Sequence, residues 1–244
     1  MIQDLHSHTY YSFCGLDTPE AVVEAAIQGG LNMIGITDHA HGVGEARYQH
    51  FNAPLQGVEV DYERTIKRYF DHLSLIKEKY AGEIKVLRGI EVATVKKHYA
   101  FPDKADISFL DYCLVEHLDF NETITEGDIF AFAKRCGCPT GIAHTDMFTF
   151  IISRGEDPLD YFTKMAQQGI FWEMNVNLDT IHNGYEHPYM LEFFENRGQQ
   201  EIVRKSGVRL SVGFDGHRVC DYKPERIADY CRRIGEMGIK LAFE

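Results

Sequence analysis

The chain has 244 residues, of which 44% are hydrophobic and 25% charged, and its formal net charge is −12 at pH 7. We expect residues 1–244 to form a single domain, since one core of this size is common in α/β barrels. The acidic balance argues against a nucleic-acid partner, because a nucleic-acid-binding surface needs basic side chains. No apolar run approaches the ~20 residues that span a membrane, so we expect no membrane partner.

The start of the chain and its cysteines bear on the cellular compartment. The N-terminus has no basic segment followed by an apolar core, so we expect no secretory signal. The six cysteines show no disulfide framework for a chain of this length. Cys136 and Cys138 have the wrong spacing for a C-x-x-C metal or redox motif, and we interpret them as structural. A reducing, cytoplasmic setting fits these features.

Seven apolar, β-branched runs of strand length recur along the chain. They are Ile2–Leu5, Met33–Thr37, Ile84–Ile90, Tyr112–Glu116, Thr140–Ala143, Ile170–Val176 and Val208–Phe214. Their hydrophobicity is continuous rather than strictly alternating, which is typical of a parallel sheet buried on both faces.

Predicted helices lie between these runs. Thr18-Pro19 predicts an N-cap followed by proline at the first helical position, and Asp157-Pro158 repeats that signal. These two helices end near Gly29-Gly30 and at Gln168; the others are Asp61–Tyr80, Glu126–Arg135, Pro188–Lys205 and Pro224–Met237. The alternation predicts an α/β fold, a distorted seven-stranded (β/α)7 TIM-like barrel, with a doubly wound open sheet as the alternative. In either fold, ligands bind at the carboxyl ends of the strands.

Metal-ligating side chains follow the predicted strands at the point where each strand ends. His6 and His8 end the first run and project from the same face of a strand. Later runs end in Asp38-His39, Glu91, Glu116-His117, His144 and Asp215-Gly216-His217, and Glu173 and Asn175 lie near the end of the sixth. Any one of these histidines is more often a hydrogen-bonded core or loop residue than a ligand. However, six of the 12 histidines directly follow predicted strands, which indicates a site for several metal ions.

The mixture of side chains at these strand ends indicates which metals bind. Imidazoles together with carboxylates suit zinc, manganese or iron, whereas carboxylates alone would suggest magnesium or calcium. Two such ions close together generate a hydroxide nucleophile at neutral pH and neutralise charge on a phosphoryl group. The sequence therefore favours metal-assisted hydrolysis.

The order of these motifs points to a known family. They are Asp4-x-His6-x-His8, Thr37-Asp38-His39, Gly89-Ile90-Glu91, His117, His144 and Asp215-x-His217. Over nearly the whole chain they resemble the PHP (polymerase and histidinol phosphatase) family. The resemblance implies a distorted seven-stranded barrel, a trinuclear metal centre and phosphoester hydrolysis.

The resemblance also implies a ligand set for each ion. His6, His8, Glu91 and Asp215 would hold the first, Glu91 would bridge to a second ion at His117 and His144, and His39 and His217 would hold a third. Asp4 and Asp38 would orient the imidazoles by accepting hydrogen bonds from the ring nitrogens that do not face the metal.

The third ligand set departs from the family pattern. Cys14 stands where the family usually supplies a further His or Asp, and Asp17 could reach in instead. A Cys14 thiolate would favour zinc over manganese. Alternatively, Cys14 only packs, and the third site is weak or empty. The expected cofactors are therefore two to three divalent ions of zinc, manganese or iron.

The resemblance implies that a metal-bridging hydroxide attacks phosphorus, with Glu91, Asp215 and His217 as the catalytic residues. Arg154 and Arg218 are candidate substrate-binding residues, since guanidinium binds phosphate oxygens in pairs. We expect Arg88 to pair within the fold instead. His182 and His187 are weaker candidates for the general acid, and we expect each to be an ordinary exposed loop histidine.

Several features favour a histidinol phosphatase and a small phosphorylated substrate, L-histidinol phosphate in particular. They are the compact domain and the segments His144-Thr145-Asp146, Glu173-Met174-Asn175 and His217-Arg218. The alternatives are a phosphodiesterase or nucleotide phosphoesterase of the same family, an amidohydrolase-like metal hydrolase, and a non-catalytic metal-binding relative. No suitably placed lysine supports the amidohydrolase. We expect the loop Ala40–Gly57 to cover the site. The sequence is also compatible with a homo-oligomer.

Overall fold

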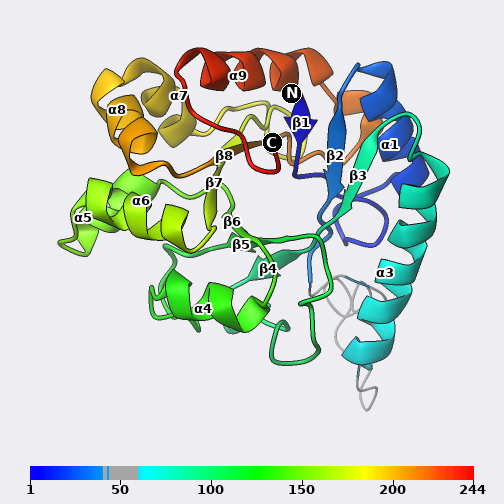
Figure 1. Ribbon diagram of the computed structural model, residues 1–244. Helices are drawn as coiled ribbons and strands as arrows, with labels where there is room; N and C mark the ends of the chain where they lie inside the picture. The colour runs from blue at the N-terminus through cyan, green and yellow to red at the C-terminus, as the bar shows by residue number, and fades with distance from the viewer. Residues whose placement is uncertain (41–42, 44–59) are drawn as a thin grey trace.

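Strands and helices alternate along the computed structural model, which describes residues 1–40, 43 and 60–244 (Figure 1). The strands are β1 (Gln3–Asp4), β2 (Met33–Ile36), β3 (Lys85–Arg88), β4 (Glu91–Ala93), β5 (Cys113–Glu116), β6 (Thr140–Ile142), β7 (Phe171–Asn175) and β8 (Leu210–Gly213). The helices are α1 (Pro19–Gln28), α3 (Tyr62–Lys79), α4 (Ile129–Cys136), α5 (Met147–Ser153), α6 (Pro158–Gln167), α7 (Pro188–Glu195), α8 (Arg197–Ser206) and α9 (Pro224–Glu236), with a short 3-10 helix η1 (Val219–Asp221). The strand pairs within the described residues are all parallel, which confirms the predicted α/β class.

The described strands form two sheets, β1-β2-β3 and β4-β5-β6-β7-β8, where the sequence predicts seven strands in one barrel. The extra strand arises because the single predicted run Ile84–Ile90 ends at β3, and β4 begins after a break at Gly89-Ile90. At the break, the Tyr69 hydroxyl donates to the carbonyl oxygen of Gly89 (3.0 Å). A Cβ atom at Gly89 would lie 2.7 Å from the ring of Tyr112, so a side chain does not fit there.

Backbone contacts join the two sheets at both of their outer edges. The amide of Leu5 donates to Val212 (2.9 Å), and the amide of Asp215 donates to His6 (2.7 Å), so β1 lies beside β8. On the other side, an isolated parallel bridge pairs His39 with Glu91. The strands thus surround a common interior, as in a barrel, although they do not form one closed sheet. This arrangement does not fit the doubly wound alternative.

Two hydrophobic clusters fill this arrangement. The inner one comprises Leu5, Met33, Leu87, Tyr112, Leu114, Ala143, Phe171 and Ala242. A larger one packs the outer faces of the strands against the helices. Because strand side chains alternate between faces, Leu114 of β5 points to the inner cluster, whereas Cys113 and Val115 point to the helices.

Side-chain caps set where the helices begin. Thr18 accepts a hydrogen bond from the amide of Ala21 (3.2 Å), as the sequence predicts for α1. The segment expected to be one helix, Pro188–Lys205, is instead α7 and α8, because the Asn196 side chain accepts from the amides of Gly198 and Gln199 and starts a new helix. Helix α5 was not predicted. Among the described residues, no helix has the length and apolarity needed to cross a membrane.

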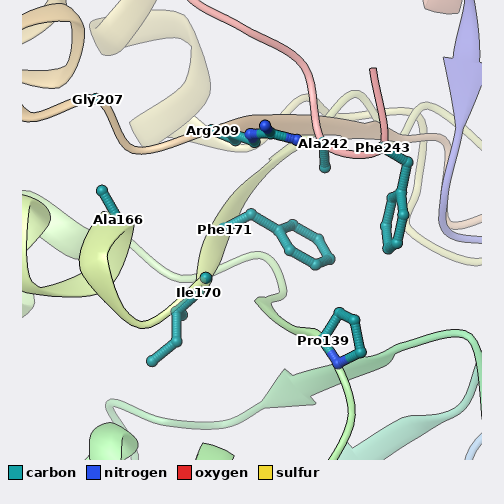
Figure 2. Close-up of a pocket in the computed structure, with 9 residues that line it drawn as sticks. Pro139, Ala166, Ile170, Phe171, Gly207, Arg209, Ala242 and Phe243 are labelled. Carbon is teal, nitrogen blue, oxygen red and sulfur yellow. The ribbon is translucent and has the colours of Figure 1, made fainter.

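A cavity of about 310 Å³ lies at the N-terminal end of the strands, away from the strand ends that carry the histidines (Figure 2). It is lined by Pro139, Ala166, Gly169, Ile170, Phe171, Gly207, Arg209, Ala242 and Phe243. The rings of Phe171 and Phe243 meet edge to face, 5.8 Å apart. The last residues of the chain therefore cover this end of the strands by apolar packing.

Arg88 pairs within the fold, as expected. Its guanidinium donates to both carboxylate oxygens of Asp111 (2.9 and 3.0 Å), and Lys77 donates to the same carboxylate. Burial alone would raise the pKa of Asp111, but these hydrogen bonds lower it from 3.8 to about 2. The ionised carboxylate therefore stabilises the folded chain.

Asp111→Asn is expected to lower the free energy of unfolding by about 2 kcal/mol at pH 7, because Arg88 loses its partner. Since the folded pKa is the depressed one, this contribution is present above pH ~4 and is lost as the pH falls toward 2. Urea unfolding at pH 7 and pH 3 measures it. The exposed pair Lys67–Asp71 provides the control, since Asp71→Asn should change little. An equal Asp111→Asn effect at both pH values would contradict the assignment.

Candidate metal centre

The carboxyl ends of the strands bring ten potential ligands together, here called the ligand cluster. They are His6, His8, Cys14, His39, Glu91, Glu116, His117, His144, Asp215 and His217. Three of them lie just past strand ends in the left-handed backbone region: His117 (φ 63°), His144 (φ 23°) and Asp215 (φ 53°). Side-chain-bearing residues persist there at an energetic cost, mostly at functional sites.

The four residues expected to hold the first ion are in mutual contact and fully or almost fully buried. The Nε2 atom of His6 lies 3.2 Å from His8 Nε2, 3.2 Å from Glu91 Oε1 and 3.5 Å from Asp215 Oδ1. His8 Nε2 lies 3.0 Å from the same Asp215 oxygen. Burial alone would raise the pKa of Glu91, but the charges of His6 and His39 hold it well below its usual value. Two imidazole nitrogens and two carboxylates therefore face one small space.

Carboxylates behind the cluster fix the direction in which two imidazoles point. His6 Nδ1 lies 2.7 Å from Glu173 Oε1, and His217 Nδ1 lies 2.6 Å from Asp179 Oδ2. A neutral imidazole that donates through Nδ1 presents its lone pair at Nε2, which here faces the cluster. Glu173 also accepts from the backbone amide of His144 (2.9 Å). Glu173 and Asp179 therefore position three residues of the cluster.

The sequence analysis placed Glu173 near the end of the sixth run without giving it a role, and it missed Asp179. Glu173 is a charged residue inside the buried run of β7, a signal that could have identified it. Asp179 lies in a loop with no motif around it, so the sequence offers no comparable signal.

The two acidic residues expected to orient imidazoles act less directly. Asp38 accepts from the hydroxyl of Ser12 (2.7 Å), and that hydroxyl lies 3.2 Å from His8 Nδ1. Asp4 instead accepts from the backbone amides of His6 (3.1 Å) and Phe214 (3.0 Å). Asp4 therefore stabilises the ends of two neighbouring strands, β1 and β8, and does not orient an imidazole ring.

The second expected set is brought together in part, because His144 contacts Glu91 whereas His117 lies beside His144 and Glu116. His144 Nε2 lies 3.1 Å from Glu91 Oε1, and the His144 and His117 rings are 6.4 Å apart. The Glu116 carboxylate lies 3.4 Å from His117 Nε2. Glu116 also lies 3.4 Å from His39 Nδ1 and forms a possible ligand group with His39 and Glu91.

At the third expected set, the structure places Cys14 rather than Asp17. Ligand atoms of His8, Cys14 and His39 all lie within 4.8 Å of one another. Burial alone would raise the pKa of the Cys14 thiol, but hydrogen bonds with His217 and His39 lower it. The Asp17 carboxylate instead accepts from the amide of Val219 (2.7 Å).

Buried polar atoms show that the cluster fits metal ions. His117 Nδ1 is buried without a hydrogen bond to any described residue, and the buried Glu91 Oε2 and Glu116 Oε1 share one His39 nitrogen, at 2.8 and 3.4 Å. Such atoms are costly unless something else satisfies them. Hydrogen bonding to Asp179 also overcomes the effect of burial and raises the pKa of His217 to about 10. The carboxylates thus favour a positive charge at the imidazole nitrogens of the cluster. A divalent ion that displaces the proton supplies that charge.

The two loop histidines lie against the cluster. The His182 ring stacks on that of His217 at 5.0 Å, and its Nε2 lies 3.8 Å from Asp215 Oδ2. The His187 ring stacks on that of His144 at 5.9 Å. Both are partly buried, so the expectation that they are ordinary exposed loop histidines is wrong.

The structure leaves the two arginine assignments as predictions. The Arg154 guanidinium lies 3.2 Å from Glu156 and over the ring of Phe150, and it lines a cavity of about 560 Å³ behind the loop that follows His117. Arg218 is exposed directly after His217. Most of the loop Ala40–Gly57, residues 41–42 and 44–57, lies outside the described residues, so its role as a cover also stays a prediction.

The family assignment rests on a match to the PHP domain family over residues 4–240. This chain belongs to that family. Among solved structures, histidinol phosphate phosphatase from Lactococcus lactis subsp. lactis Il1403, crystallised with zinc, L-histidinol and phosphate, is 16% identical with a TM-score of 0.60. The match covers 98% of this chain and 95% of that one, which shows a shared fold.

A putative histidinol phosphatase from Listeria monocytogenes is 17% identical, with a TM-score of 0.49 and coverage of 94% of this chain and 100% of that one. A comparison with curated protein sequences found no match.

Asp179→Asn is expected to weaken metal binding at the His217 side of the cluster by about 10- to 100-fold, because the imidazole loses the carboxylate that orients it. The amides of Ile181 and His182 can still donate to the remaining side-chain oxygen, so the loop should keep its shape. Zinc titration against a competing chelator measures the loss. Asp221→Asn is the control, since its carboxylate accepts from Thr180. Unchanged affinity in Asp179→Asn would contradict the positioning role.

Proposed function

We propose that this protein is a metal-dependent phosphomonoesterase of the histidinol-phosphatase type. The observation that carries the proposal is the convergence of imidazole Nε2 atoms and carboxylate oxygens, held from behind by Glu173 and Asp179. Membership of the PHP domain family supports phosphoester chemistry. The fold shared with the lactococcal phosphatase, which binds zinc, L-histidinol and phosphate, supports the substrate class.

Three ligand groups would hold two to three divalent ions of zinc, manganese or iron. His6, His8, Glu91 and Asp215 would hold the first, Glu91 with Glu116, His117 and His144 the second, and Cys14, His39 and His217 the third. Bound ions would supply a hydroxide nucleophile at neutral pH and neutralise the charge of the phosphoryl oxygens.

The chain's own residues would complete the chemistry. Glu173 and Asp179 keep the Nδ1 atoms of His6 and His217 occupied, so that Nε2 stays available to a cation. His182, whose Nε2 lies 3.8 Å from Asp215 Oδ2, would hold a proton beside the phosphoryl group of the substrate. Arg218 follows His217 directly and would pair with the phosphate of a small substrate.

Phosphate release from L-histidinol phosphate, measured beside p-nitrophenyl phosphate with zinc or manganese supplied, tests the proposal. Selective hydrolysis of L-histidinol phosphate is the expected result. Activity on the generic ester alone would support the metal chemistry and remove the substrate assignment. No activity on either ester would favour a phosphodiesterase or a non-catalytic relative.

Cys14→Ser is expected to reduce the preference of the centre for zinc over manganese, because a soft thiolate is replaced by a hydroxyl oxygen. Competition between the two metals, followed by mass spectrometry of metal content, measures the change. Cys220→Ser is the matched control, since Cys220 is an exposed cysteine of η1. The same zinc preference in Cys14→Ser and the unaltered protein would mean that Cys14 only packs.

A further inference from the structure

The imidazoles of the ligand cluster differ in their exposure to solvent. The side chains of His117 and His144 are 24% and 20% exposed, whereas those of the other four histidines of the cluster are 0–12% exposed. In the described part of the chain, a small ester therefore has access to the cluster from the side of His117 and His144, here called the mouth.

An aromatic ring lies against each of the two exposed imidazoles. The Phe120 ring packs on that of His117, with the ring centroids 4.5 Å apart. The His187 ring stacks on that of His144 at 5.9 Å, with an angle of 13° between the ring planes. The loops that follow β5 and β7 thus border the mouth with one ring beside each exposed imidazole.

Phe120 is a large apolar side chain that the fold leaves in solvent. It is 57% exposed, although its ring contacts a member of the ligand cluster. The backbone holds it there, because the Phe120 amide donates to the carbonyl oxygen of His117 (3.1 Å), and the Thr94 hydroxyl donates to the same oxygen (3.0 Å). An exposed ring held in a fixed position is available to stack on a second planar group.

The space beside Phe120 is large enough for the organic part of a substrate. Phe120 lines the cavity of about 560 Å³ that also holds Arg154, and this volume is within the range of small-molecule sites. Other residues of its wall include Lys96, which follows β4, and Asp146, which follows β6. The cavity therefore lies at the same carboxyl ends of the strands as the ligand cluster.

His187 is held by its neighbours while its imidazole stays available. Its side chain makes no capping hydrogen bond at the start of α7. The preceding residue, Glu186, pairs with Arg226 of α9 and fixes the chain beside the ring. The border of the mouth on the His144 side is therefore anchored as well.

Resting on the phosphomonoesterase activity proposed above, we propose that Phe120 selects substrates whose leaving group carries a planar ring, by stacking on that ring at the mouth. The phosphoryl group lies at the ligand cluster, and the leaving group extends past His117 toward Phe120 and its cavity. Because stacking needs a flat ring face, an aliphatic leaving group gains less from Phe120. Phe120 is thus a specificity residue.

Calorimetric titration of the zinc-loaded, full-length protein with phenylphosphonate and with methylphosphonate tests the proposal without turnover. The two probes share the phosphonate group, and only the first has a ring. We expect phenylphosphonate to bind about tenfold more tightly. Phe120→Leu should lose most of this preference and keep the affinity for methylphosphonate, which reports an intact ligand cluster.

Phe109→Leu is the matched control, since Phe109 is another exposed phenylalanine and packs on Phe70 of α3. It should keep the preference for phenylphosphonate. Equal binding of the two phosphonates by the unaltered protein, or an unchanged preference in Phe120→Leu, would overturn the proposal. Loss of methylphosphonate affinity in Phe120→Leu would also overturn it, because Phe120 would then support the ligand cluster itself.

Failure of the proposed function has a different signature. In that case phenylphosphonate still binds more tightly through Phe120, but the protein releases phosphate from no ester. The binding measurement therefore tests the role of Phe120, and the assay of phosphate release tests the reaction.

Discussion

Replacing Glu91 by glutamine is expected to lower kcat/KM for phosphoester hydrolysis by about a thousandfold or more. Glu91 is buried at the centre of the ligand cluster, with one oxygen within 3.2 Å of His6 and His144 and the other 2.8 Å from His39. The amide keeps the shape of the side chain but removes the negative charge that would be shared between two ions. The loss should appear in metal content as well as in rate.

The Glu91→Gln measurement needs a fold control, since the residue is buried. Circular dichroism should show a folded protein with reduced zinc or manganese content. Glu83→Gln, at an exposed position before β3, should keep both activity and metal. Near-normal turnover by folded Glu91→Gln would remove the bridging assignment.

Removing metal is expected to abolish activity and to destabilise the fold. The cluster gathers acidic and imidazole groups in a buried space, and an ion that binds only the folded chain stabilises it by about 4 kcal/mol at 1,000 times its Kd. For a chain of this length, that corresponds to a decrease in Tm of roughly 10 °C after chelation. Calorimetry with and without a chelator measures the shift, and added zinc or manganese should restore both Tm and activity.

The matched control for chelation is the Glu91→Gln variant, whose Tm should respond less because it holds less metal. An unaltered protein whose Tm and activity are both unaffected by a chelator that strips its metal would contradict a catalytic metal centre.

The sequence predicted that these side chains converge, because parallel strands bring their carboxyl ends to one rim. His6, His8, Glu91, His144 and Asp215 each follow an apolar run, and their contacts follow from that rule. The position of each residue directly after an apolar run was enough to place it at this rim. The division of one predicted strand at Gly89 was missed because it depends on Tyr69 and Tyr112, which are distant in sequence.

Loop residues were harder to place, because their positions depend on local hydrogen bonds that leave no periodic signal. Asp179 accepts from the amides of Ile181 and His182 and so turns His182 back onto His217. The same turn brings the Asp179 carboxylate to the His217 ring. Nothing in the spacing of these residues indicates that the loop folds inward. Similarly, Asn196 ends one helix and starts another by capping alone.

The most direct test of this account is a crystal structure of the purified protein with anomalous scattering measured at the zinc and manganese absorption edges. We expect two or three anomalous peaks among His6, His8, Cys14, His39, Glu91, Glu116, His117, His144, Asp215 and His217, with Glu91 between two of them. Crystals grown with either metal that show no anomalous peak within this cluster would contradict the central claim that these residues form a metal centre.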